Sequence, residues 1–166
     1  LSCFDITSKI SIDLQNPIQQ IEKFFIKNPL VKKLLIHNAD LIFENKSEDV
    51  IFACSNYFKS MFGLSMYSPE YTKIALEKGI KNFQIPCNIL DQRWDFFQIK
   101  ESDVYVEARS VFLQGILLKN NIKLPSLIST DYLKAINKID NISRKNNLSR
   151  LETLISGASK KYINSL

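Results

Sequence analysis

Polar side chains recur at the carboxyl ends of short apolar segments that the sequence predicts to be β-strands. These residues are Lys9, His37, Ser65 and the pair Arg109–Ser110, together with Gln84, which lies within its predicted strand. In sheets of parallel strands, ligands bind at the edge formed by the carboxyl ends. A single lysine or histidine at such a place is more often a surface or structural residue. Five in succession predict one polar site, in which an ammonium, an imidazole, amides and hydroxyls are available for binding and proton transfer.

The same residues argue against metal chemistry. His37 is the only histidine, and Cys3, Cys54 and Cys87 are isolated from one another, with no Cys-x-x-Cys pair. Structural zinc sites use closely spaced cysteines and histidines, so we expect no metal. An odd number of scattered cysteines also argues against a disulfide framework and suits a reducing compartment, which favours a cytoplasmic location.

The elements that must position these residues alternate between strands and helices. The predicted strands are Phe4–Ile10, Leu34–Ile36, Met61–Ser65, Asn82–Pro86 and Val104–Ala108, with a possible sixth at Tyr162–Leu166. The predicted helices begin near Asn16–Pro17, Ser47 and Ser68, span Asp131–Asn146, and begin again at Ser149. This rhythm is typical of a parallel sheet with helices packed outside it.

Local signals place the ends and faces of these helices. Ser68 is a predicted N-cap, and Ser149 with Glu152 forms a predicted capping box, with Gly157 at the end of that last helix. Tyr71, Ile74 and Ala75 are expected to face inward on one helix, and Leu133, Ile136 and Ile139 on another. The sheet itself has two possible forms: an open doubly wound sheet, or most of an eight-stranded barrel.

Composition bounds the class of protein. The chain has 166 residues, 45% apolar and 23% charged, with a formal charge of +5. These are globular proportions, and one domain is the default at this length. No apolar run reaches the roughly 18 residues of a membrane helix, so no membrane partner is expected. The basic pairs Lys32–Lys33 and Lys160–Lys161 are too short for a nucleic-acid tract, and Gly-x-Gly-x-x-Gly and P-loop motifs are absent.

Two longer segments resemble the aldo/keto reductases. Gln84–Trp94 is similar to the sixth barrel strand and its loop in a bacterial branch of that family, and Ala108–Leu118 is similar to the seventh. Shorter matches to the third, fourth and fifth strands come in the same order, at Ile6–Lys9, Leu34–Asn38 and Gly63–Ser68. The resemblance implies an α/β fold, a partial (β/α)8 barrel with strands three to seven and possibly the start of strand eight. Residues 1–166 would then form a single barrel domain, incomplete at both ends.

The resemblance also implies catalytic residues and an activity. Members of this family transfer a hydride between NADP(H) and a carbonyl compound with an Asp, a Tyr, a Lys and a His. Lys9 matches the Lys and His37 the His, whereas the Asp and the Tyr would lie before residue 1. A nearby ammonium lowers the pKa of a tyrosine, and an imidazole can orient the carbonyl. The implied substrate is a small aldehyde, ketone or sugar carbonyl.

Cofactor contacts follow from the same resemblance. Ser65 and Gln84 match positions that hold the nicotinamide carboxamide, while Ser110, Phe112 and Gln114 match the loop along the pyrophosphate. Arg109 stands where many members place an aromatic residue stacked on the nicotinamide, and a guanidinium can also stack on a flat ring. Met66 stands where many members have Asn. The segment that binds the 2′-phosphate would begin after Leu166, so the preference for NADP(H) comes from the family alone.

Two other functions remain open at this point. One is a non-catalytic barrel relative that binds nucleotide and acts as a partner or sensor. The other, weaker one is a basic scaffold for nucleic acid. If the chain is a fragment, we expect it to be inactive alone and aggregation-prone, because an unclosed barrel leaves strand edges unpaired and apolar side chains exposed inside. The oligomeric state is not readable from the sequence.

Overall fold

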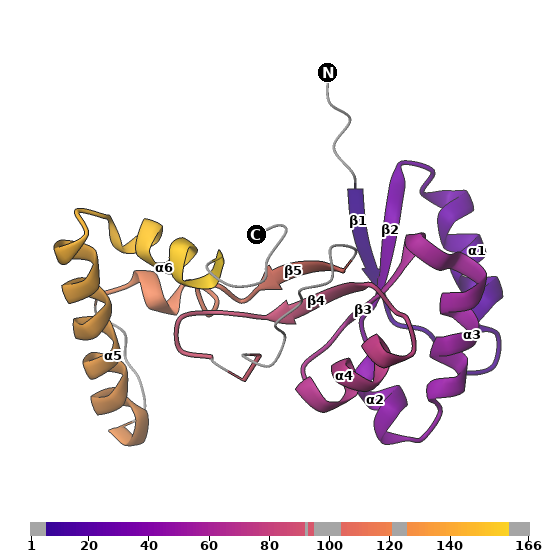
Figure 1. Ribbon diagram of the computed structural model, residues 1–166, viewed down its shortest axis with the longest axis horizontal. Helices are drawn as coiled ribbons and strands as arrows, with labels where there is room; N and C mark the ends of the chain where they lie inside the picture. The colour runs from indigo at the N-terminus through magenta and orange to yellow at the C-terminus, as the bar shows by residue number, and fades with distance from the viewer. Residues whose placement is uncertain (1–5, 92, 95–103, 121–125, 160–166) are drawn as a thin grey trace. The chain divides into compact units, whose positions relative to one another are not determined.

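A computed structural model describes residues 6–91, 93–94, 104–120 and 126–159, which alternate between strands and helices (Figure 1). The strands are β1 (Ile6–Ile10), β2 (Val31–Ile36), β3 (Phe62–Ser65), β4 (Asn82–Pro86) and β5 (Tyr105–Arg109). The helices are α1 (Pro17–Lys27), α2 (Ala39–Glu44), α3 (Glu48–Phe58), α4 (Pro69–Glu77), α5 (Ser126–Lys145) and α6 (Arg150–Ser159), with 3-10 turns η1 (Lys59–Met61) and η2 (Ile116–Leu118). The possible strand at 162–166 lies outside the described residues.

The five strands form one sheet in the order β1-β2-β3-β4-β5. The pairs β1–β2, β2–β3 and β3–β4 are parallel, and the chain passes through at least one helix between the strands of each of these pairs. Strands that pair in sequence order with helical crossovers are the arrangement of a (β/α)8 barrel rather than of a doubly wound sheet, whose order changes direction. The predicted α/β fold class, a partial barrel, is confirmed.

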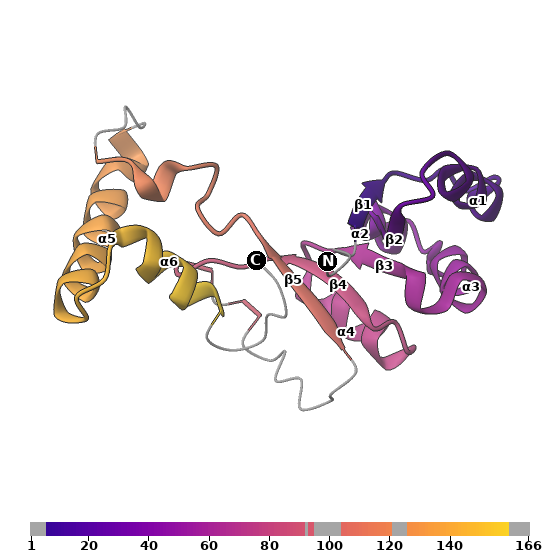
Figure 2. The ribbon, with the colours of Figure 1, turned by 90° about the horizontal axis from the view of Figure 1, so that it is seen from above.

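The chain divides into two compact units. The first comprises residues 1–85 and 100–106, and the second residues 86–99 and 107–166. In the first unit, Figures 1 and 2 show α1 and α3 together on one side of β1–β3. The expectation of a single barrel domain stays a prediction.

In the first unit, one face of the sheet is apolar and packs against the helices. Leu34, Ile36, Leu64 and Phe83 alternate along β2, β3 and β4, and all are fully buried. The helices contribute their own buried side chains, which include Ile21, Ile51 and Phe58. Burying a large aliphatic or aromatic side chain contributes about 1.5–3 kcal/mol, so this face supplies most of the stability of the unit.

The opposite face of the same strands is mostly polar, which corrects one expectation. Side chains alternate along a strand, so the residues between the buried apolar ones point the other way. They are Thr7, Lys9, Lys33, Leu35, His37, Gly63, Ser65, Asn82 and Gln84. Leu35 is the large aliphatic side chain among them. The predicted exposure of apolar groups inside an unclosed barrel is therefore wrong for these strands, because their inner positions carry groups that water solvates well.

The helix signals in the sequence are mostly confirmed. Pro17 begins α1, and the Ser68 hydroxyl accepts a hydrogen bond from the Tyr71 N–H at the start of α4. The capping box is complete: the Glu152 carboxylate accepts from the Ser149 N–H at 2.7 Å, and the Ser149 hydroxyl accepts from the Glu152 N–H at 3.2 Å. These bonds satisfy donors at the start of α6 that have no partner within the helix.

Three local expectations are wrong. Gly157 lies inside α6 rather than at its end, and a Cβ there would come within 3.2 Å of Ile89, so the glycine permits close packing. Ile74 is 40% exposed and Leu133 is 53% exposed, although both were expected to face inward. The buried stripe of α4 runs through Thr72 and Ala75, which turns the neighbouring Ile74 toward water.

The second unit has a small core of its own. Leu117, Ile136, Ile139 and Leu154 are buried together, and Phe112 packs against them. Above this core, Arg150 at the start of α6 donates to both carboxylate oxygens of Asp140 on α5, at 2.7 and 2.6 Å. The Arg150 guanidinium holds the pKa of Asp140 below its usual range. The pair therefore links α5 to α6 while Asp140 is ionised.

This link makes the second unit acid-sensitive. The pKa of Asp140 is lower in the folded state than in the unfolded state. The ionised carboxylate therefore contributes its full share of the folding stability above the unfolded pKa of about 4, and this stabilisation is lost as the pH falls through the folded pKa. We expect Asp140→Asn to destabilise the α5–α6 pair by about 0.5–1 kcal/mol at pH 7, and to cost much less at pH 2.5. Thermal melts of both proteins at the two pH values measure this. An equal difference at both pH values would contradict the role of the charge.

Several classes of site can be assessed within the described residues. No helix among them is long and apolar enough to cross a membrane. No group of three or more His, Cys, Asp or Glu side chains there is placed to hold a metal ion.

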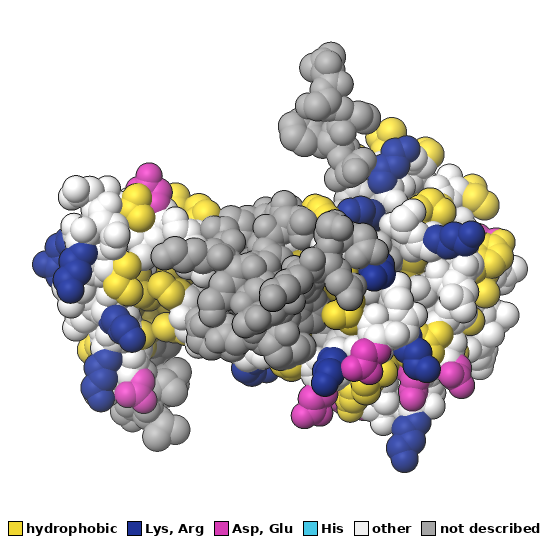
Figure 3. Space-filling model, viewed as in Figure 1, with side chains coloured by type: hydrophobic (Ala, Val, Ile, Leu, Met, Phe, Trp, Pro, Cys, Tyr) yellow, Lys and Arg dark blue, Asp and Glu magenta, His cyan; other side chains and the backbone are white. Residues whose placement is uncertain are grey.

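Burial raises the pKa of the Cys54 thiol to about 11, so this cysteine is protonated at neutral pH. On the face in Figure 3, Lys and Arg side chains are scattered rather than gathered into one continuous patch.

Candidate functional site

Three of the predicted site residues meet at the carboxyl ends of the strands in the first unit. Lys9 on β1 donates from Nζ to Oε1 of Gln84 on β4, at 2.8 Å. The Ser65 hydroxyl on β3 lies 3.4 Å from the same oxygen. The three side chains come from strands that are not all neighbours, with β2 between β1 and β3. They therefore reach one another across the polar face of the sheet.

The strand register explains why these residues share a face. Lys9 is in register with Leu35, and Leu35 with Gly63. Ser65 lies two residues beyond Gly63 and is in register with Gln84. Paired residues of a parallel sheet, and residues two apart in one strand, point to the same side. Gly63 has no side chain, and Asn82 and Leu35 pack closely against its backbone in the space that a Cβ would take.

His37 lies at the same end of the sheet. It follows β2 directly, and its N–H donates to the Ile10 carbonyl at 2.7 Å, which continues the pairing of β1 with β2. It is two residues beyond Leu35, the partner of Lys9, so His37 and Lys9 belong to the same face and the same edge. The expectation that these two residues converge on one rim is consistent with this register. The His37 side chain is exposed and accessible to a ligand.

A neighbouring residue, Asn38, fixes the two loops that carry these side chains. Its Oδ1 accepts from the Ile12 N–H at 3.0 Å, and its Nδ2 donates to the Ile12 carbonyl at 2.9 Å. The Asn38 side-chain amide therefore satisfies both the N–H and the C=O of Ile12, a buried residue just beyond β1. Because Asn38 also follows His37, the clamp holds the chain after Lys9 against the chain after His37.

Asn38→Leu should loosen this end of the sheet. The substitution leaves the N–H and C=O of Ile12 without their partner, at a cost of roughly 1–3 kcal/mol for each unsatisfied group that stays buried. We expect a lower melting temperature and faster hydrogen exchange at Ile12. Asn56→Leu, on the exposed face of α3, is the matched control. Unchanged exchange at Ile12 would contradict the clamp.

Asp40 organises the loop after Ser65 in the same manner. Its two carboxylate oxygens accept from the N–H groups of Tyr67 and Ser68, at 2.6 and 3.1 Å. Hydrogen bonds to a carboxylate are stronger than neutral ones, so this contact orients the chain that leaves β3. Asn38 and Asp40 were missed from the sequence. The available signal was that both residues follow the end of β2. Asn and Asp side chains at such positions often accept hydrogen bonds from nearby backbone N–H groups.

The other predicted cofactor residues belong to the second unit. The Arg109 carbonyl accepts from the Cys87 N–H at 3.0 Å. Ser110 and Gln114 are exposed, and Phe112 is half-buried against the core of that unit. Ser110, Leu113, Gln114 and Gly115 all have positive φ, from 45° to 82°, so the loop turns repeatedly. Whether these residues line the same cleft as Lys9, Ser65 and Gln84 stays a prediction.

Solved structures define the class of fold. The chain is similar to an aldo-keto reductase from Bacillus halodurans in its holo form, with 18% identity and a TM-score of 0.51. The match covers 74% of this chain and 46% of that one. The apo form of an aldo-keto reductase from the same organism gives 19% identity and a TM-score of 0.48, covering 72% and 44% of the two chains. No protein-family model and no curated protein matches the sequence.

The chain therefore has the fold of part of an aldo-keto reductase barrel. At this level of identity the likeness shows the fold alone. The chain spans less than half the length of the reductase it matches. The similarity in fold agrees with the barrel that the sequence motifs led us to expect.

Proposed function

We propose that this chain forms the cofactor half of an oxidoreductase that transfers a hydride between NADP(H) and a small aldehyde, ketone or sugar carbonyl. The observation that carries the proposal is the meeting of Lys9, Ser65 and Gln84 at one point on the carboxyl edge of the sheet. This edge is where (β/α)8 barrels bind substrates and cofactors. A cytoplasmic location is proposed with it, because the three cysteines are odd in number and scattered along the sequence, which suits a reducing compartment.

The donors and acceptors at this point fit a nicotinamide carboxamide. Lys9 can only donate, so the Gln84 atom that faces it is the oxygen, and the Gln84 NH₂ group is the other end of the amide. That NH₂ can donate to the carboxamide oxygen, while the Ser65 hydroxyl can accept from or donate to the carboxamide. Ser65 is fully buried and its hydroxyl lies 3.4 Å from the Gln84 oxygen, so it also helps to orient the Gln84 amide.

Lys9 and His37 are the residues of this chain nearest the proposed reaction. The bound nicotinamide supplies or accepts the hydride. The Lys9 ammonium, held by Gln84, places a positive charge where negative charge develops on the carbonyl oxygen, and this lowers the barrier. An N–H of the His37 imidazole can orient that oxygen. By the family resemblance, a tyrosine from an earlier strand donates the proton, and this sequence does not include it.

The loop 110–115 is proposed to bind the pyrophosphate. Ser110 offers a hydroxyl and Gln114 an amide, both exposed. The left-handed backbone at residues 113–115 turns successive N–H groups in directions that a helix or strand does not allow, a geometry used for phosphate binding. Arg109 is proposed to stack on the nicotinamide ring.

A fluorescence titration with NADPH and NADH tests the proposal. We expect saturable binding of NADPH by the chain, weaker binding of NADH, and a Kd about three- to tenfold higher for Gln84→Ala and for Ser65→Ala, the loss of about one hydrogen bond. Gln19→Ala, on the exposed face of α1, is the control and should leave Kd unchanged. Equal affinity in all four proteins would place the cofactor elsewhere.

A further inference from the structure

The proposed pyrophosphate loop, residues 110–115, leads into a segment that two helices of the second unit hold in place. The Tyr132 hydroxyl on α5 shares its hydrogen between the Lys119 carbonyl, at 2.7 Å, and the Ile116 carbonyl, at 3.0 Å. Arg150 at the start of α6 donates from Nη1 to the same Lys119 carbonyl, at 3.3 Å. These carbonyls belong to η2 and to the residue that follows it, and η2 begins directly after the loop. Both helices therefore restrain the downstream end of the loop.

The apolar side of the loop is anchored to the same helices. Phe112 and Leu113 pack against the buried core of the second unit, and Tyr132 packs against that core as well. The polar residues of the loop, Ser110 and Gln114, are exposed. The loop thus has an apolar side that is fixed and a polar side that a ligand can reach.

The backbone of this loop needs such support. Ser110, Leu113 and Gln114 have φ between 45° and 60°, a region that residues other than glycine disfavour, and Gly115 continues at φ 82°. Such conformations persist only where surrounding contacts hold them. The N–H groups of Gln114 and Gly115 have no acceptor among the residues that the structure describes. Successive N–H groups in a turn of this kind form concavities that bind anions.

A purely structural role of Tyr132 and Arg150 would be to complete η2, whose last carbonyls need donors. The backbone already serves one of them, because the Lys119 N–H donates to the Ile116 carbonyl at 3.2 Å. The Lys119 carbonyl receives both the phenol and the guanidinium. Arg150 is itself oriented by Asp140, to which it donates from Nε and Nη2. Two side chains from two helices on one short turn restrain more than that turn requires.

We propose that Tyr132 and Arg150 are positioning residues for nucleotide binding, because they hold the loop 110–115 in the conformation that accepts the pyrophosphate. Both act through backbone carbonyls after the loop and not by touching the ligand. A loop that is held in its bound conformation loses less entropy when the ligand arrives, which raises affinity. The inference rests on the proposed role of this loop in cofactor binding and adds the residues that keep the loop in shape.

Tyr132→Phe tests the first tether, because it removes the hydroxyl and keeps the ring that packs against the core. Tyr57→Phe is the matched control: this tyrosine on α3, in the first unit, donates its hydroxyl to Glu22 at 2.7 Å. Ser143→Ala separates positioning from stability. The Ser143 and Thr153 hydroxyls are buried and lie 2.7 Å apart, so they join the same two helices through a bond that does not involve the loop.

Arg150→Lys tests the second tether. Lysine keeps the positive charge opposite Asp140 and lacks the planar fork that reaches Asp140 and the Lys119 carbonyl together. We expect it to weaken pyrophosphate binding as Tyr132→Phe does. If the charge of Arg150 were sufficient, Arg150→Lys would bind pyrophosphate with the wild-type Kd, and this result would overturn the role of Arg150.

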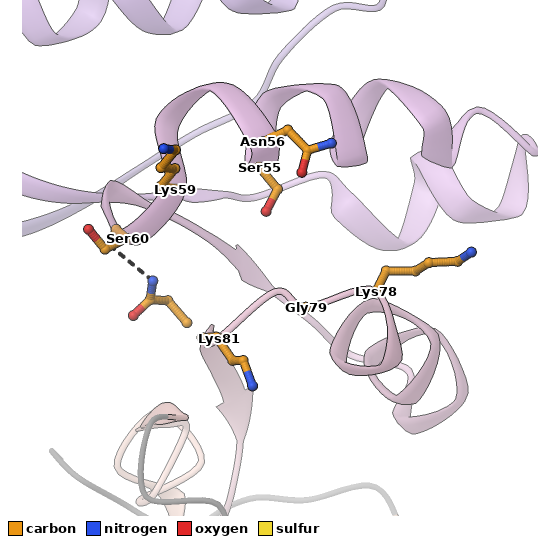
Figure 4. Close-up of a pocket in the computed structure, with 8 residues that line it drawn as sticks. Ser55, Asn56, Lys59, Ser60, Lys78, Gly79 and Lys81 are labelled. Atoms are coloured by element: carbon orange, nitrogen blue, oxygen red, sulfur yellow. Dashed lines mark hydrogen bonds between the residues drawn. The ribbon is translucent and has the colours of Figure 1, made fainter.

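The measurement is an NMR titration of the ¹⁵N-glycine-labelled chain with inorganic pyrophosphate and with NADPH, at constant ionic strength. The Gly115 amide reports on the loop, and Gly79 in the first unit is the reference signal. Gly79 lies beside a polar cavity in which the side chains of Lys59 and Lys78 point away from one another rather than toward a shared ligand (Figure 4). We expect a saturable shift at Gly115 with both ligands and none at Gly79.

The Kd for pyrophosphate should rise about three- to tenfold in Tyr132→Phe and in Arg150→Lys, the loss of about one hydrogen bond. It should stay unchanged in Tyr57→Phe and in Ser143→Ala, although Ser143→Ala lowers the melting temperature. The wild-type Kd in Tyr132→Phe, or an equal rise in Ser143→Ala, would overturn the inference and leave the cofactor site intact. Tyr132-dependent pyrophosphate binding without NADPH binding would support the inference and contradict the proposed function. No saturable shift at Gly115 with either ligand would overturn the inference.

Discussion

Replacing Lys9 with methionine should lower the rate of carbonyl reduction by roughly 10²–10⁴-fold in the complete protein that contains this chain. Methionine keeps the length of the stem and removes the ammonium. The charge that Lys9 holds 2.8 Å from the Gln84 oxygen is then absent from the edge of the sheet where the oxyanion is proposed to form. The control is Lys23→Met, which makes the same substitution on the exposed face of α1, outside the site.

The assay follows NADPH oxidation with a panel of aldehydes and ketones. A loss confined to kcat indicates that Lys9 acts in the transition state, whereas a change in KM for NADPH alone indicates that it acts only by holding Gln84. Equal turnover in wild type and Lys9→Met would contradict the assigned role. A protein that binds NADPH and reduces none of the carbonyls would instead be the non-catalytic relative that the sequence also allowed.

Gly63→Ala should destabilise the first unit by about 2–3 kcal/mol and lower its melting temperature by roughly 8–24 °C. A Cβ at Gly63 would lie 2.6 Å from the Asn82 carbonyl oxygen and 2.7 Å from Cδ2 of Leu35. The first of these atoms belongs to the backbone of β4, so the strand itself must shift to accept the methyl group.

The control for Gly63 is Gly79→Asn. Gly79 has φ 86°, but a Cβ there would meet no atom within 4 Å, and asparagine tolerates the left-handed region. This variant should melt within a few degrees of wild type. If Gly63→Ala is equally stable, β3 does not approach Asn82 and Leu35 as closely as described, and the shared face of Lys9, Ser65 and Gln84 loses its basis.

Much of the fold was predictable from local signals. The N-cap at Ser68 and the capping box of Ser149 and Glu152 act within one helical turn, so the sequence alone reports them. The alternation of apolar and polar residues in β2 to β4 determines which side chains face the helices. For this reason the convergence of Lys9, Ser65 and Gln84 could be predicted before their distances were known.

Other features depend on contacts between distant segments and carry no local signal. The clamp of Asn38 on Ile12 joins residues 26 positions apart, and Asp40 reaches the loop after Ser65 across 27 positions. Gly157 resembled a helix end because glycine often ends helices, whereas here it accommodates Ile89 from another segment.

The most direct test of the proposed cofactor site is the NMR signal of the Gln84 side-chain NH₂ group during a titration with NADPH. This group is the donor proposed for the nicotinamide carboxamide, and its signal is assigned by its loss in Gln84→Ala. We predict a saturable shift of the Gln84 NH₂ signal at the same Kd as the fluorescence titration, with the Gln19 signal unchanged. Saturable NADPH binding that leaves the Gln84 signal in place would contradict the assignment of this edge of the sheet as the nicotinamide site.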